Sequence, residues 1–294
     1  GIQERIYEIM ATLLSLKRRM KAAQNVSKTT KAMQMIATSK LKKAQEAALT
    51  SRPYVTKLTE LTQAISLQTP EAHKHPYMLL HKDAHGTLLL ALAPDKGLCG
   101  GLITNLIKEF FLNAHASEHT TLIIMGKKLE NQAVRVNRDI IASFNFGTKL
   151  PPFSSVFPLV RLINDYYLTG KVQSVKVLYT DFSNLFTQKP KVLQLLPIAL
   201  PDAETIKADE LTLYEPSLPE LVPSLLTHYL EMSLYQLLLE SFLSEQAARM
   251  IAMQNATNNA KDIIEELRLE YNKTRQTKIT SELLDIVGGR SMHA

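Results

Sequence analysis

The sequence predicts an α/β protein, in which a long antiparallel coiled coil of N- and C-terminal helices carries an inserted Rossmann-like α/β domain. Neither proline nor glycine occurs in two long runs, 2–52 and 224–287, although the 294 residues include thirteen prolines and ten glycines. Because proline costs about 3 kcal/mol inside a helix and glycine about 1 kcal/mol, both runs are candidate long helices. Between them, apolar and partly β-branched runs alternate with helical patterns, which is typical of βαβ units.

The first run carries an apolar seam. Six apolar residues recur at alternating steps of three and four, namely Ile2, Ile6, Ile9, Leu13, Leu16 and Met20. This spacing keeps a stripe of side chains facing a partner helix, so it predicts a coiled coil. Four further apolar residues extend the predicted seam with looser spacing, namely Val26, Met33, Ile36 and Leu41.

The last run has the length and the charge to be the partner of the first. Residues 2–52 carry eleven basic and three acidic side chains, whereas residues 224–287 carry six basic and nine acidic ones. The last run is rich in leucine at 225–243 and then turns to small and amide residues at 244–260. Small residues permit a thin shaft that could slide inside another structure, or they mark a locally weak coiled coil, and both interpretations stay open.

The limits of the segments follow from local signals. Ser217 to Glu220 form a capping box that predicts the start of the second helix, and Gly288-Gly289 predicts its end. We expect an N-terminal coiled-coil helix at 1–58, a central α/β domain at 59–215 and a C-terminal coiled-coil helix at 216–294.

The central segment predicts a mostly parallel sheet covered by helices. Strands are expected at 87–93, 120–125 and 174–180, and helices at 102–114, 127–135 and 154–168. Residues 192–198 are a candidate edge strand, because Pro190 and Pro197 limit its length.

The glycine-rich turn after the first predicted strand, Gly97–Gly101, is a candidate phosphate site. A strand, glycines and a helix N-terminus can hold a phosphate, but the spacing matches neither GxGxxG nor a Walker loop. The alternative is that the glycines permit a tight turn and close packing of the helix on the sheet. Cys99 in this turn is either a nucleophile activated by the helix end or, as we expect, a small buried hydrophobe.

Two histidine pairs, His81/His85 and His115/His119, have the i,i+4 spacing of helical metal ligands. No HExxH motif accompanies them, so we expect solvated histidines and no metal site. The longest apolar runs are far shorter than the 18 or so residues of a membrane span, the first twenty residues have no uninterrupted apolar centre, and there is one cysteine. We therefore expect a soluble intracellular protein without a secretory signal.

Between Met10 and Gln45 the chain has nine basic and no acidic residues. Such a run indicates either a nucleic-acid surface or a docking face for an acidic protein. Interleaved aromatic residues are missing from it, which favours the protein partner.

Three stretches of the chain resemble one family, the gamma subunit of the F-type ATP synthases in its bacterial form. They are LKRRMKAAQNVSKTTKAMQMIATSKLKKAQ at 16–45, DKGLCGGL at 95–102 and SEQAARMIAMQNATNNAKDIIEELRLEYNKTRQTKITSELLDIVGG at 244–289. Their order and spacing also match, so the resemblance covers about residues 10–289.

This resemblance implies a non-catalytic central rotor shaft that couples transmembrane proton flow to ATP synthesis or hydrolysis. The implied partners are three alpha and three beta subunits, the epsilon subunit and the ring of c subunits. Membrane contact would run only through the c ring, on the cytoplasmic side of the cell inner membrane. Neither a cofactor nor a nucleic acid is implied, and the nucleotide-like fold would bind no nucleotide at Gly97–Gly101.

The resemblance also implies roles for single residues. Met33 matches a position of tight coupling between the shaft and a beta subunit, and the C-terminal coupling positions are matched by Arg249, Arg275, Gln276 and Thr280. Glu215 matches the foot that approaches the c ring and epsilon. The alternative functions are a freestanding nucleic-acid-binding protein that uses the basic helix and a small-molecule enzyme that uses the Gly97–Gly101 turn.

Overall fold

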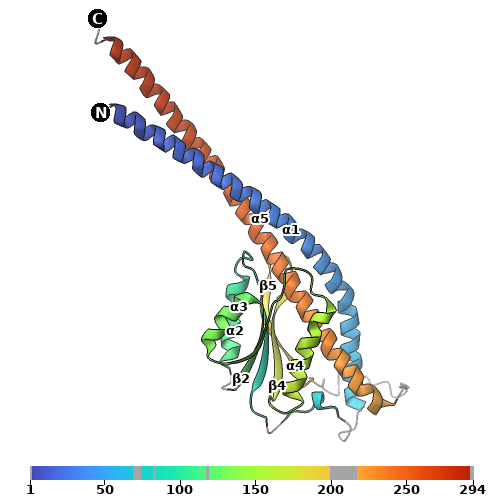
Figure 1. Ribbon diagram of the computed structural model, residues 1–294. Helices are drawn as coiled ribbons and strands as arrows, with labels where there is room; N and C mark the ends of the chain where they lie inside the picture. The colour runs from blue at the N-terminus through green and yellow to red at the C-terminus, as the bar shows by residue number, and fades with distance from the viewer. Residues whose placement is uncertain (1, 69–73, 82–83, 117–118, 199–216, 292–294) are drawn as a thin grey trace. The chain divides into compact units, whose positions relative to one another are not determined.

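The computed structural model describes all residues except 1, 69–73, 82–83, 117–118, 199–216 and 292–294 (Figure 1). Its contacts divide the chain into two compact units, residues 37–249 and residues 1–36 with 250–294. The helices are α1 (Ile2–Gln68), α2 (Leu102–Ala114), α3 (Lys127–Ala133), α4 (Phe157–Tyr167) and α5 (Leu218–Ser291), with short 3₁₀ turns η2 (Pro76–Met78), η3 (Val134–Val136) and η4 (Phe153–Val156). The strands are β1 (Thr87–Leu92), β2 (Thr120–Met125), β3 (Asp139–Phe144), β4 (Ser174–Phe182) and β5 (Gln188–Leu196). In the described part of the chain, the apolar stretches of the helices fall short of what crossing a membrane requires.

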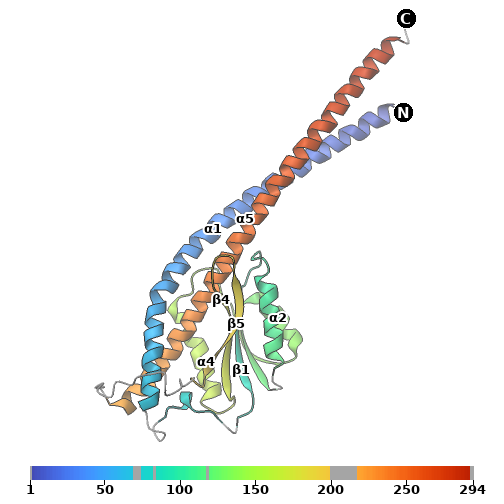
Figure 2. The same ribbon diagram turned by 180° about the vertical axis from the view of Figure 1, so that it is seen from behind.

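The unit of residues 37–249 contains a five-stranded sheet with the order β3-β2-β1-β4-β5. The first four strands are parallel and β5 runs antiparallel to β4. Helices α2 and α3 lie on one face of the sheet, and α4 and α5 lie on the other, as the two opposite views show (Figures 1 and 2). Both faces of the central strands are therefore covered, which explains why β1 reads as an uninterrupted apolar run, TLLLAL.

The predicted alternation of strands and helices in the centre is confirmed. The three central strands and the three covering helices lie where the patterns placed them, and the edge strand β5 is longer than predicted, starting at Gln188. The sequence analysis missed β3, whose residues are only half-buried or exposed. An outer strand with little buried surface leaves a weak apolar signal, which is why the pattern did not reveal it.

The ends of the two long helices differ from the prediction. Helix α1 continues through Pro53 to Gln68, and α5 continues through Gly288-Gly289 to Ser291. Burial explains the first difference, because Leu58, Thr62 and Ile65 beyond the proline are all buried. Packing of these later turns offsets the hydrogen bond that the proline removes. The start of α5 at Leu218, directly after Ser217, agrees with the predicted capping box.

The two long helices are antiparallel, as predicted. In the unit of residues 1–36 and 250–294, the Thr30 hydroxyl lies 2.8 Å from the Thr257 hydroxyl, and the Gln34 amide donates to the side chain of Gln254. The partner number falls on α5 as the number rises on α1, which is the signature of antiparallel helices. The predicted fold class is thus confirmed.

The seam of α1 is more polar than predicted. Val26 and Ile36, which the sequence analysis placed in the seam, are 52% and 56% exposed. The half-buried or buried positions instead continue the alternating steps of three and four through Leu13, Leu16, Met20, Ala23, Ser27, Thr30, Gln34 and Ala37. Small and polar residues occupy this part of the seam, so a search for apolar residues chose two wrong positions, Val26 and Ile36, whereas the predicted Met33 is half-buried and Leu41 is buried.

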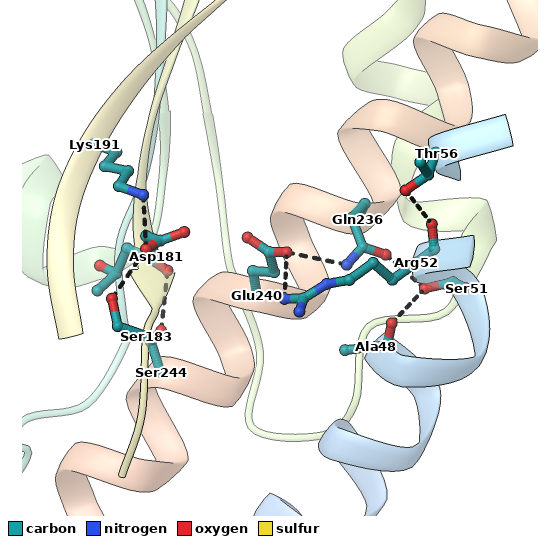
Figure 3. A network of polar contacts seen from close by, with 11 residues as sticks. Ala48, Ser51, Arg52, Thr56, Asp181, Ser183, Lys191, Gln236, Glu240 and Ser244 are labelled. Atoms are coloured by element: carbon teal, nitrogen blue, oxygen red, sulfur yellow. Dashed lines mark hydrogen bonds and ion pairs between the residues drawn. The ribbon is translucent and has the colours of Figure 1, made fainter. Parts of the chain in front are cut away.

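In the unit of residues 37–249, a polar network links α1 to α5 (Figure 3). Arg52 on α1 forms an ion pair with Glu240 on α5, with 3.2 Å between Nη2 and Oε1. Gln236 donates to the same carboxylate oxygen at 3.1 Å and accepts from the Ser51 hydroxyl at 2.5 Å. On its other side α5 packs on the sheet, where the buried Ser244 donates to the Thr180 carbonyl at 3.0 Å.

The predicted segment limits remain a prediction. Helix α1 extends beyond residue 58, and the limit at residue 215 lies outside the described residues.

Candidate functional site

The turn that follows β1 packs against α5. Leu98 and Gly100 adopt positive φ values of 64° and 59°, so the chain reverses tightly before α2 begins. Cys99 and Leu102 are buried together with Ala248 of α5 in one small apolar cluster. The small side chains of Ser244, Ala247 and Ala248 thus allow α5 to approach the turn closely, which gives this stretch of α5 a packing role in this unit.

Asp95 in this turn ties three loops together. Its carboxylate accepts hydrogen bonds from the backbone N–H groups of Lys127 at 3.0 Å, Phe146 at 3.2 Å and Gly147 at 2.7 Å. These donors follow β2 and β3, whereas Asp95 follows β1. Because hydrogen bonds to a charged acceptor are strong, one side chain holds the carboxyl edge of the sheet in a single arrangement.

Arg249 clamps the same turn to α5. Its Nη1 lies 2.6 Å from Oε1 of Glu245, one helical turn earlier. Its Nη2 donates to the carbonyl oxygens of Lys96 at 3.1 Å and Gly97 at 3.3 Å. The guanidinium therefore uses its fork on one carboxylate and two backbone carbonyls at once, a geometry that a lysine could not reproduce.

Glu245 is only 3% exposed, and its second oxygen, Oε2, is buried without a hydrogen-bond partner among the described residues. Burial raises the pKa of Glu245 above its ordinary value, although the neighbouring Arg249 opposes the shift. Burial likewise raises the pKa of the Cys99 thiol. A buried, protonated thiol is a poor nucleophile, so the geometry favours the small buried hydrophobe over catalysis at Cys99.

Helix α5 occupies the region where doubly wound sheets bind ligands, beyond the carboxyl ends of the strands where the strand order reverses. Here that point lies between β1 and β4. Arg249 contacts the turn after β1, and Ser244 contacts Thr180 near the end of β4. The Gly97–Gly101 turn is thus engaged by the chain's own helix. The positive φ of Gly100 supports the tight turn, whereas an added Cβ at Gly97 or Gly101 would meet no atom closer than 3.8 Å, so close packing does not explain these two glycines.

The histidine pairs do not form the helical arrangement of metal ligands. His115 stands at the C-terminal end of α2, so His119 is not one turn further along a helix. His81 lies outside helices and packs edge-on against Tyr167, with 4.9 Å between ring centroids. Within the described residues, His, Cys, Asp and Glu side chains do not gather into groups of three or more that could hold a metal ion.

The other residues singled out from the sequence lie on the long helices. Met33 is half-buried on α1, and Arg275, Gln276 and Thr280 are exposed on α5. The Thr280 hydroxyl donates to the Gln276 carbonyl at 3.0 Å, which places these two side chains on one helix face. Glu215 lies outside the described residues.

Sequence reasoning missed the roles of Asp95 and Glu245. Both stand inside the stretches that carry the resemblance, DKGLCGGL and SEQAARM. An available signal was the i,i+4 spacing of Glu245 and Arg249, which predicts an ion pair on a helix. Nothing in the sequence indicates that three loops converge on Asp95.

Comparison with known proteins agrees with this architecture. A family model described as ATP synthase matches residues 12–292. The ATP synthase gamma chain of Dehalococcoides mccartyi strain BAV1 is 40% identical over 289 residues, covering 95% of this chain and 98% of that protein. The gamma chain of Paraburkholderia phytofirmans is 36% identical over 296 residues, covering 95% and 99%.

Solved structures show the same fold. A chain in the Euglena gracilis mitochondrial ATP synthase, in a structure that contains OSCP, F1 and the c-ring, aligns with a TM-score of 0.67 and 18% identity, covering 96% of this chain and 95% of that chain. A chain in the central stalk and c-ring structure from Tetrahymena thermophila aligns with a TM-score of 0.59 and 24% identity, covering 78% and 99%.

None of these relatives supports a nucleic-acid-binding protein. The sequence matches span nearly the full length of this chain and of each relative, at identities well above those of chance resemblance. With its two long antiparallel helices and its inserted α/β sheet, the chain therefore belongs to the ATP synthase gamma chains, the central stalk subunits of the F-type enzyme.

Proposed function

We propose that this chain is the rotating shaft of an F-type ATP synthase, which couples proton flow across a membrane to ATP synthesis or hydrolysis. The observation that carries this proposal is the pair of antiparallel helices of 67 and 74 residues in a gamma-chain relative. Helices of this length are stiff along their axes, and stiffness is what a shaft needs to transmit torque.

Exposed apolar side chains on the long helices are evidence that a partner protein surrounds these helices. On α1 these include Val26, Met35 and Ile36, and on α5 they include Ile263, Leu269 and Ile279. Exposed apolar surface of this kind is typical of an interaction site. In the proposed assembly, three alpha and three beta subunits form the sleeve around the helices.

The basic residues of α1 indicate that the surrounding alpha and beta subunits present an acidic surface to the shaft. Eight of the nine cations between Met10 and Gln45 are exposed, namely Lys17, Arg18, Arg19, Lys21, Lys28, Lys31, Lys42 and Lys43. Exposed charges contribute to steering and register more than to tight binding. A rotor must leave each position, so weak electrostatic contacts suit the proposed role.

In this proposal the chain catalyses no reaction itself and holds no cofactor. Met33, Arg275, Gln276 and Thr280 couple the shaft directly to the beta subunits, and Arg249 contributes to this coupling by holding α5 on the turn after β1. Glu215 belongs to the foot that meets the c ring and the epsilon subunit. The protein is peripheral, on the cytoplasmic face of a bacterial inner membrane, and touches the membrane only through the c ring.

A proline in the shaft tests the proposal. Ala256 lies on α5 within the helix pair, so Ala256→Pro removes one backbone hydrogen bond and kinks the helix. We expect the assembled enzyme to hydrolyse ATP while pumping fewer protons per ATP, whereas Ala256→Ser keeps normal coupling. Normal proton pumping by the proline variant, in a complex shown to contain it, would contradict a rigid shaft.

Composition of the complex gives an independent test. Native mass spectrometry of the complex purified from the source cells should show one copy of this chain with three copies each of two larger subunits. A lone chain, or a chain bound to nucleic acid, would contradict the proposal.

A further inference from the structure

The contacts at the carboxyl edge of the sheet extend to α1 and close into a continuous network. Lys40 on α1 donates from Nζ to the Thr148 carbonyl at 2.5 Å, in the loop after β3. The same loop supplies the N–H groups of Phe146 and Gly147 that bind Asp95. We call this set the edge network; its side chains are Lys40, Asp95, Glu245 and Arg249, and its backbone groups belong to Lys96, Gly97, Lys127, Phe146, Gly147 and Thr148.

The edge network joins two helices through the sheet rather than directly. From α5, Arg249 reaches the turn after β1, and Asp95 connects this turn to the loop after β3. From α1, Lys40 reaches the far side of that loop. Each helix is thus attached to the α/β domain by a cationic side chain that donates to backbone carbonyls.

The position of these attachments along the chain is informative. Arg249 is the last residue of the compact unit 37–249, and Lys40 stands three residues after its start at Ala37. Both attachments therefore lie within this unit, near the ends of the helical segments that belong to it. A torque carried along α1 or α5 can pass to the α/β domain through these attachments, beside the contacts of Phe242 with Phe146 and of Ser244 with Thr180.

The chemistry of the network suits a joint that must resist twisting. Glu245 is nearly inaccessible and pairs with Arg249, and buried charge-assisted hydrogen bonds hold their geometry far better than surface ion pairs do. The neighbouring charges also act on α1, since burial and the nearby Arg249 lower the pKa of Lys40.

We propose that the edge network is the torque-bearing joint between the α/β domain and the helical shaft, with Asp95 and Glu245 as its positioning residues. This inference rests on the proposed function, because only a rotor has torque to transmit. Glu245 is buried, so it acts by orienting the guanidinium of Arg249 and not by touching another subunit.

The test uses the assembled ATP synthase that carries this chain, in vesicles and on a single-molecule stage. Glu245→Gln keeps the size of the side chain and removes the charge that holds Arg249. We expect ATP hydrolysis to continue while the torsional stiffness of the rotor falls, because a neutral amide holds the guanidinium of Arg249 more weakly than a carboxylate does. Proton pumping per hydrolysed ATP should fall with the stiffness.

Glu240→Gln is the matched control. Glu240 is also a buried α5 carboxylate paired with an arginine, Arg52, but it links α5 to α1 and contacts none of the loops at the sheet edge. We expect Glu240→Gln to keep the wild-type stiffness. Equal losses in the two variants would mean that general helix stability is responsible, and the proposal would be wrong.

Lys40→Met examines the joint from α1 without changing the buried pair, and covers the case in which Glu245→Gln fails to assemble. Hydrogen exchange of the amides at 96–101 in the complex reports directly on the clamp and should be faster in Glu245→Gln. If the stiffness and the pumping ratio of Lys40→Met equal those of the wild type, the joint is refuted. A wild-type complex that pumps no protons would instead refute the proposed function itself.

Discussion

The hydroxyl groups of Thr30 on α1 and Thr257 on α5 lie 2.8 Å apart in the seam of the antiparallel helix pair. Each hydroxyl also lies within donating distance of a carbonyl on its own helix, Thr257 at 2.7 Å from the Met253 oxygen and Thr30 at 3.0 Å from the Val26 oxygen, so either hydroxyl can be the donor between the helices. A polar pair in this seam is narrow and directional, and it fixes the register of the two helices where apolar contacts are small.

The threonine pair should behave as a coupled unit. Either Thr30→Val or Thr257→Val should lower the free energy of unfolding by about 1 kcal/mol, because each leaves one hydroxyl without its partner. The double variant should cost less than the sum, since it leaves no unpaired hydroxyl between the helices. Urea unfolding of all four proteins measures this difference, and strict additivity would show that the two hydroxyls do not interact.

Gly126 should be irreplaceable, whereas Gly147 should tolerate a side chain better. Gly126 has a φ of +115°, and a Cβ there would lie 1.9 Å from the Ala93 carbonyl oxygen. Gly147 has a φ of +86° with no atom within 4 Å of an added Cβ. We expect Gly126→Ala to cost roughly 3 kcal/mol or more and Gly147→Ala about 1 kcal/mol, because only the first adds a clash to the backbone strain. Similar thermal unfolding midpoints for the two variants would contradict this assignment.

Removing the proline inside α1 should stabilise the protein. Pro53 is exposed and lacks the N–H that would bond the carbonyl one turn earlier. Pro53→Ala should raise the free energy of unfolding by about 1–3 kcal/mol. The gain is smaller if the helix already bends enough to accommodate the proline ring. Lys57→Ala on the same exposed stretch is the control, because it should change the stability little. A destabilised Pro53→Ala would show that the bend itself is needed for packing.

Glu245 should make stability depend on pH. Burial raises its pKa above the ordinary 4.5, so the folded chain holds the proton more tightly than the unfolded chain does. The contribution of this group is therefore fully present below pH 4.5 and is lost as the pH rises through the raised pKa. As the pH rises from 4.5 through the raised pKa, the wild type should lose unfolding free energy in urea relative to Glu245→Gln. A difference that stays constant with pH would show that the carboxyl group does not titrate with a raised pKa.

Local patterns in the sequence were enough to predict the strands and helices of the centre and the presence of two long helices. The strands β1 and β2 are recognisable because both faces are covered, so nearly every residue must be apolar. The long helices are recognisable because helix breakers are missing over long stretches. Both patterns can be recognised without knowing which distant residues come into contact.

Tertiary packing decided the rest. Helix α1 passes through Pro53 because later turns are buried, and the seam uses Ser27, Thr30 and Gln34 where apolarity pointed to Val26 and Ile36. Asp95 binds backbone groups of the loops after β2 and β3 that are 32 to 52 positions away in the sequence. Arg249 binds Gly97, which is 152 positions away. The sequence by itself determined which segments are helix and strand, because those preferences are local. Only the tertiary structure decided which polar groups share one buried site, because that depends on desolvation by elements far apart in the chain.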